Sequence, residues 1–114
     1  MKSDEHDTAY LWDMLQAARE AHGYVARISL ERYLKDRSRR RALERTLEIL
    51  GEAARRVGKS TRARHADIDW RRIIGQRNVL AHEYGEVDDT LLYRTAREHL
   101  PELIRLIEKR VSED

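Results

Sequence analysis

Five residues near position 80 bring together side chains that can act on a phosphodiester bond. Arg77, Asn78, His82 and Tyr84 carry a guanidinium, an amide, an imidazole and a phenol, and the small Ala81 lies among them. On an α-helix each residue turns the chain by about 100°, so the five positions share one arc of about 160°. The spacing therefore predicts a shallow polar hollow on one face of a helix.

Three of the polar groups in this arc suit the chemistry of RNA cleavage. His82 can move a proton near neutral pH, because the pKa of free histidine is about 6.5. Arg77 can donate two parallel hydrogen bonds to phosphate oxygens, and Asn78 can orient His82 or hold a non-bridging oxygen. RNA supplies its own nucleophile, the 2′-hydroxyl, so no metal ion or covalent residue is required. The same spacing also fits ordinary surface residues, and on spacing alone both interpretations stay open.

The reaction needs both a base and an acid, and this arc offers one histidine for the two roles. A homodimer would place two copies of His82 across a two-fold axis and would supply both groups. We therefore expect a composite active site, made from both subunits.

The elements that must position this arc are predicted to be helices. The 114 residues include only 5 Gly and 1 Pro, which is a poor composition for a turn-rich β fold. Apolar residues recur every three or four positions, so we expect an all-α, up-down bundle of about five helices in one domain, residues 1–114. The expected helices span about 4–27, 29–34, 38–57, 69–85 and 88–111, with a basic loop over 59–67 and an interruption at Pro101.

The third expected helix carries the clearest packing signal. Leu43, Leu47, Leu50, Ala54 and Val57 follow the a/d rhythm of a bundle seam. Gly51 lies inside this helix, where glycine costs about 1 kcal/mol relative to alanine, so we expect a neighbouring helix to approach it closely. Other residues expected to pack are Trp12, Tyr33 and Trp70, and those expected to cap helices are Ser29, Ser38, Asp69 and Asp88.

Positive charge gathers in the middle of the chain. Residues 32–77 contain 15 Lys and Arg against 6 Asp and Glu, whereas the net charge of the whole chain is +2. Arginine dominates, and its planar fork matches phosphate oxygens. This pattern favours a polyanionic partner for one face, and Arg39, Arg40 and Arg41 are candidate RNA contacts. Solvated helix faces would give the same pattern.

Several classes of protein are disfavoured by what the sequence lacks. There is no Cys, which excludes disulfides and thiolate metal sites. The histidines show no shared metal-ligand spacing, so we expect no metal site and no cofactor. The sequence shows neither a signal peptide nor a membrane-spanning run, and we expect a cytoplasmic protein without a membrane partner.

The sequence resembles the HepT-like toxins of the HEPN ribonuclease superfamily. Their signature, Arg-x4-His-x-Tyr, is matched by Arg77, His82 and Tyr84. The resemblance extends from about residue 8 to residue 110 and includes the stretches 51–54, 70–75, 87–88 and 100–103. One small difference is Tyr33, where the family often carries Phe.

The resemblance implies a homodimeric, metal-independent endoribonuclease with Arg77 and His82 as catalytic residues and Asn78 in support. It implies the toxin of a type VII-like toxin–antitoxin system, partnered by a minimal nucleotidyltransferase antitoxin of the MntA type. Such antitoxins are thought to transfer AMP from ATP to the motif tyrosine, which is Tyr84 here. An AMP group at that position would put an anionic phosphate and a bulky base in the path of the RNA.

Two other functions remain as alternatives. The chain could be a non-catalytic helical module that binds a nucleotide or partners a nucleotidyltransferase and cleaves nothing. A basic helical DNA binder is a weaker interpretation, because no helix-turn-helix signature is present and the arginines are spread over several elements.

Overall fold

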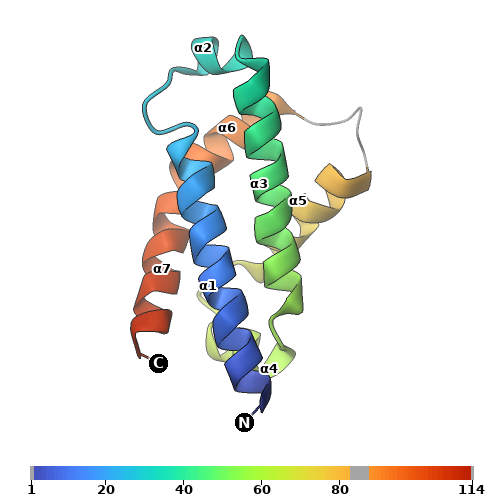
Figure 1. The fold of residues 1–114 in the computed structure, drawn as a ribbon, viewed down its shortest axis with the longest axis vertical. Coiled ribbons are helices and arrows are strands. Elements are labelled where there is room, and N and C mark those ends of the chain that lie inside the picture. Colours follow the sequence, from blue (N-terminus) through green and yellow to red (C-terminus); the bar gives the residue numbers. More distant parts are fainter. Residues whose placement is uncertain (1, 83–87, 114) are drawn as a thin grey trace.

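A computed structural model gives the fold of the chain (Figure 1). It describes the backbone of residues 2–82 and 88–113 and the side chains of residues 6–78 and 88–112. Within these residues every regular element is a helix, which confirms the expected all-α fold. None of the described helices is both long and apolar enough to cross a bilayer.

Four longer segments run alternately up and down the molecule (Figure 1). They are α1 (Lys2–Gly23), α3 (Arg37–Arg56), α5 (Trp70–His82) and α7 (Leu100–Glu113). The short helices α2 (Leu30–Leu34), α4 (Lys59–Arg64) and α6 (Asp89–Arg94) lie at the ends of the bundle, and a π-helical segment, Thr95–His99, joins α6 to α7. The described residues thus form seven α-helices where about five were expected, because the connections themselves are helical.

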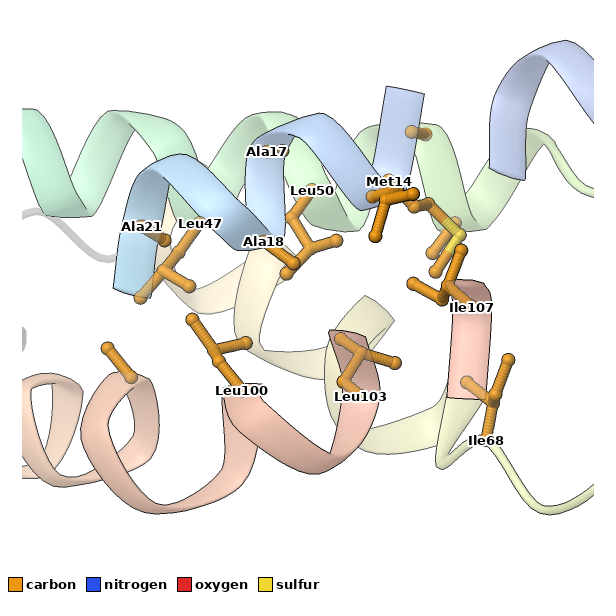
Figure 2. Packing of buried hydrophobic residues seen from close by; sticks show 14 of the residues in the cluster. Met14, Ala17, Ala18, Ala21, Leu47, Leu50, Ile68, Leu100, Leu103 and Ile107 are labelled. Carbon is orange, nitrogen blue, oxygen red and sulfur yellow. The ribbon is translucent and has the colours of Figure 1, made fainter. Parts of the chain in front are cut away.

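The core lies between α1, α3 and α7. Met14 and Ala18 of α1 point towards Leu50 of α3 and towards Leu103 and Ile107 of α7 (Figure 2). The predicted seam of α3 is confirmed, since all five of its apolar residues are at most 2% exposed. Tyr33 and Trp70 are buried as expected, but the packing prediction for Trp12 is wrong, because its side chain is 51% exposed.

The helix ends follow the predicted caps with one exception. The side chains of Ser29, Asp69 and Asp88 each accept a hydrogen bond from the backbone N–H three residues later. The helix α3 is capped by Asp36 rather than Ser38, with Asp36 Oδ1 3.0 Å from the Arg39 nitrogen. This backbone hydrogen bond is the largest cause that lowers the pKa of Asp36. Aspartate and serine are near-equal caps, so the sequence could not choose between neighbouring candidates.

The expected break at Pro101 takes the form of a π-helix, and the chain stays helical through it. Proline has no N–H to donate to the preceding turn, and the wider π turn directly before Leu100 accommodates this loss. Arg97 of the π-helix donates to the carbonyl oxygens of Val25 and Ile28 at 3.1 and 3.0 Å. The segment is therefore tied to the connection between α1 and α2.

The predicted loop over 59–67 is wrong in its first two thirds, where residues Lys59–Arg64 form α4. A buried carboxylate of α1 explains this helix. Asp7, which is 6% exposed, accepts a hydrogen bond from the backbone N–H of Gly58 at 3.1 Å and a second one from the Thr61 hydroxyl. Gly58 is thus the N-cap of α4 and has an extended backbone.

Replacing Asp7 with alanine should lower the free energy of unfolding by about 2 kcal/mol, because two donors would lose a charged acceptor in a buried place. Denaturant unfolding monitored by circular dichroism measures this loss. Asp13→Ala is the matched control, since Asp13 is exposed on the same helix, and it should change the unfolding free energy by less than about 0.5 kcal/mol. Equal effects of the two substitutions would contradict the anchoring role of Asp7.

Candidate active site

Four of the five positions of the predicted polar arc, from Arg77 to His82, lie on α5, which is one continuous helix from Trp70 through His82. Arg77 and Asn78 are fully described, whereas the side chain of His82 and all of Tyr84 lie outside the described residues. The backbone spacing of Arg77 and His82 is therefore the helical one that the arc assumes.

The guanidinium of Arg77 is held between α3 and its own helix. Its Nη2 lies 3.0 Å from Oε2 of Glu52, and its Nη1 donates to Oδ1 of Asn78 at 3.1 Å. The Arg77 side chain is 22% exposed, and Asn78 is exposed beside it. The arginine is thus oriented by two partners and still reaches solvent, as a group that receives a phosphate must do.

Glu52 serves three arginines at once. Besides Arg77, it pairs with Arg55 at 2.7 Å and with Arg56 at 3.4 Å. The hydrogen bond from Arg55 is the largest cause that lowers the pKa of Glu52, and the charges of Arg55, Arg77 and Arg56 add to it. Three guanidinium groups thus share one carboxylate, and Glu52 fixes the Arg77 geometry. The sequence analysis assigned no role to Glu52, which it included only in the stretch 51–54 that resembles the family.

The close approach predicted at Gly51 is confirmed. A Cβ built on Gly51 would lie 2.1 Å from Cβ and 2.8 Å from Cγ of Arg77, and 3.0 Å from the carbonyl oxygen of Ile73. Only glycine lets α5 come this near to α3. The glycine and the following glutamate therefore set the position of Arg77 together.

A hollow of about 550 Å³ opens beside Arg77, between α1 and α3. Its lining is mostly polar and charged, and Arg77 is the one residue of α5 among the described lining residues. Two large apolar side chains are exposed on the helices that border this hollow. Ile49 of α3 lines the hollow and is 43% exposed, whereas Trp12 of α1 does not line it and lies one helical turn before the lining residue Gln16.

The structure does not bring Arg39, Arg40 and Arg41 to this site. They lie in the first turns of α3, and Arg41 is separated from Glu52 by roughly 17 Å of helix. Arg39 donates to Asp36 and to the carbonyl oxygen of Tyr24, and Arg40 pairs with Asp89 at 3.1 Å. RNA contact by these arginines stays a prediction. Among the described residues, no group of three His, Asp or Glu side chains could hold a metal ion.

Comparison with known proteins places these features in a family. The model of the family "Ribonuclease HepT-like" matches residues 14–110. The protein named "Putative RNase TTE0752" of Caldanaerobacter subterraneus subsp. tengcongensis is 38% identical over 91% of this chain and 89% of its own length. "Probable ribonuclease HepT" of Thermococcus cleftensis is 33% identical over 96% of this chain and 97% of its own length.

A third relative, "Putative RNase MJ1380" of Methanocaldococcus jannaschii, is 30% identical over 88% of this chain and 92% of its own length. No solved structure is a significant match to the chain. The family model covers most of the sequence, including Arg77 and His82, and the three relatives are covered nearly end to end. The chain therefore belongs to the HepT-like ribonuclease family.

Proposed function

We propose that this chain is the toxin of a type VII-like toxin–antitoxin system and cleaves RNA without a metal ion. The observation that carries the proposal is the Arg77 guanidinium, oriented by Glu52 and Asn78, five residues before His82. Membership of a ribonuclease family supports the same activity.

In the proposed reaction a histidine removes the proton of a 2′-hydroxyl, and the 2′-oxygen attacks the adjacent phosphorus. The bond from phosphorus to the 5′-oxygen breaks, and a second histidine protonates the leaving oxygen. The products are a 2′,3′-cyclic phosphate and a 5′-hydroxyl. Arg77 stabilises the negative charge that builds on the phosphate in the transition state.

The two histidines would be the two copies of His82 in a homodimer. The exposed apolar side chains beside Arg77 support this arrangement, since Ile49 lines the same hollow as Arg77 and Trp12 is exposed on the bordering helix α1. Burying these side chains against a second copy would favour association through the hydrophobic effect and would bring two α5 helices towards one another.

The purified protein, free of any partner and in the presence of EDTA, should cleave RNA and leave 2′,3′-cyclic phosphate ends. His82→Ala should lower the cleavage rate by roughly 10²-fold or more, because it removes both the base and the acid of the dimer. Mass spectrometry of the RNA fragments identifies the ends, and His99→Ala is the control at an exposed histidine of the π-helix. Unchanged cleavage by His82→Ala would refute the assignment, and absence of cleavage by the unmodified protein would favour a non-catalytic binding module.

We further propose that an MntA-type nucleotidyltransferase neutralises the toxin by transferring AMP from ATP to the hydroxyl of Tyr84, with release of pyrophosphate. Incubation with such a transferase and ATP should add the mass of one or more AMP units to the tryptic peptide that contains Tyr84. Tyr84→Phe should remain toxic and escape this modification. Addition to Tyr33 or Tyr93 instead would contradict the mapping, and both of those tyrosines are buried.

A further inference from the structure

A second depression, a groove of about 840 Å³, lies over α4 and α5 and reaches the candidate active site. Its lining comes from α4, from the link between the helices and from α5 as far as Asn78. Asn78 also accepts the hydrogen bond from Arg77, so one residue joins the groove to the catalytic guanidinium. The residues that line the groove are Lys59, Arg62, Ala63, Ala66, Asp67, Ile68, Asp69, Trp70, Arg71, Ile74, Gly75 and Asn78.

The three cations of this groove lack acidic partners among the residues that the structure describes. Lys59 and Arg71 are exposed, and Nε of Arg62 is buried without a hydrogen-bond partner in the described part of the chain. Elsewhere many basic side chains are engaged, as Arg19 is with Glu108 and Arg40 is with Asp89. The groove therefore holds cations whose charge is available to a ligand.

The two acidic residues of the groove are already engaged. Asp67 accepts a hydrogen bond from Arg110 at 2.7 Å, and Oδ1 of Asp69 accepts from the backbone N–H of Arg72 at 3.2 Å. The arginine offsets the charge of the first carboxylate, and the start of α5 stabilises the second. They do not cancel the positive charge of Lys59, Arg62 and Arg71.

The shape of the groove favours a polynucleotide backbone over stacked bases. Trp70 is only 8% exposed, and its Nε1 donates to the carbonyl oxygen of His65 at 3.0 Å. Its ring is therefore buried and offers no open face on which a base could stack. Outside its own helix backbone, no heavy atom lies within 4 Å of a Cβ built on the lining residue Gly75, so the space beside it is open. Stacking needs an accessible aromatic face, whereas phosphates need cationic donors along an open channel.

We propose that this groove binds the phosphates of the RNA strand on one side of the scissile bond and delivers the strand to Asn78 and Arg77. The proposal rests on the proposed ribonuclease function and assigns Lys59, Arg62 and Arg71 as phosphate contacts. Because phosphates carry no sequence information, the groove contributes affinity that is the same for every RNA sequence.

Binding of a fluorescent single-stranded RNA oligonucleotide tests the groove. The His82→Ala background keeps the RNA intact during titration. Lys59→Gln/Arg71→Gln should raise the Kd by roughly tenfold and reduce the slope of log K against log salt by about 1.4, since each phosphate contact on a single strand accounts for about 0.7. Both residues are exposed, so the double variant should unfold at the same temperature as its parent.

The matched control is Arg94→Gln/Lys109→Gln. It removes the same charge from exposed positions on α6 and α7 that also lack acidic partners among the described residues. This control should change the Kd by less than about twofold. In the active protein the groove variant should raise KM and leave kcat nearly unchanged, because contacts away from the scissile bond act equally on the ground and transition states.

The outcomes separate this proposal from the proposed function. Equal Kd values and salt slopes for the groove and control variants would overturn the groove, even if His82→Ala abolishes cleavage. Weaker RNA binding by the groove variant alone would uphold the groove, even if the unmodified protein cleaves no RNA and the catalytic proposal fails.

Discussion

Arg77→Ala should lower the rate of RNA cleavage by roughly 10²-fold or more and leave the fold intact. The guanidinium is the group that we propose stabilises the charged phosphate, whereas its contribution to the stability of the fold is replaceable. Glu52 would keep Arg55 and Arg56 as partners after the substitution. We therefore expect the melting temperature to fall by no more than a few degrees.

Arg77→Lys sharpens this prediction. A lysine retains the charge but has a single ammonium, which cannot contact Glu52, Asn78 and a phosphate in the geometry that the planar fork allows. Cleavage should fall by at least tenfold, measured as kcat/KM on a defined RNA. Arg105→Lys is the control, because Arg105 is exposed on α7 and its ion pair within the described part of the chain is with its helix neighbour Glu102. If Arg77→Lys cleaves at the unmodified rate, the guanidinium makes no specific contact in the transition state.

The parts of the fold that local sequence dictates were predictable. The apolar rhythm of α3, the caps at Ser29 and Asp88, and the interruption near Pro101 each depend on a few neighbouring residues. The close helix approach at Gly51 was also predictable. A glycine destabilises the helix that contains it, so its presence there indicates that a neighbouring helix packs closely against it. Arg77, Asn78 and His82 could likewise be placed on one helix, because their assignment depends on local spacing along the chain.

The parts that depend on contacts between distant residues were not predictable. The helix α4 forms where Asp7, about fifty residues earlier, binds its first turn. The link from Glu52 to Arg77 joins two helices and has no local signature. Trp12 is a large apolar residue of the kind that usually packs in a core, and only the folded structure shows that its side chain is exposed.

The Glu52 cluster and the α4–α5 groove suggest how one small domain divides its work on RNA. The groove offers cations without acidic partners among the described residues, which suits binding that is tolerant of sequence. At the reacting bond the arginine is instead fixed by a carboxylate and an amide, which suits transition-state stabilisation by a preorganised donor. Binding and chemistry would then respond to different substitutions.

Gly51→Ala should damage both stability and activity, although alanine is the better helix former by about 1 kcal/mol. The added methyl would overlap Cβ of Arg77, and α5 would have to move away from α3. Overpacking of this kind lowers the free energy of unfolding by about 1–3 kcal/mol. Displacing Arg77 by even about 1 Å could lower the cleavage rate by roughly 10²-fold, because the reaction depends on near-attack geometry. Denaturant unfolding and a cleavage assay on the same sample measure both losses.

Gly75→Ala is the stability control, since a Cβ at this helical position meets nothing within 4 Å, and it should raise the free energy of unfolding by up to about 1 kcal/mol. The double variant Gly51→Ala/Arg77→Gly tests the steric cause directly. Arg77→Gly removes the Cβ that the new methyl would strike, so the double variant should be more stable than the sum of the two single losses predicts. Strict additivity of the two losses would show that the contact between position 51 and the Arg77 side chain does not cause the loss of stability.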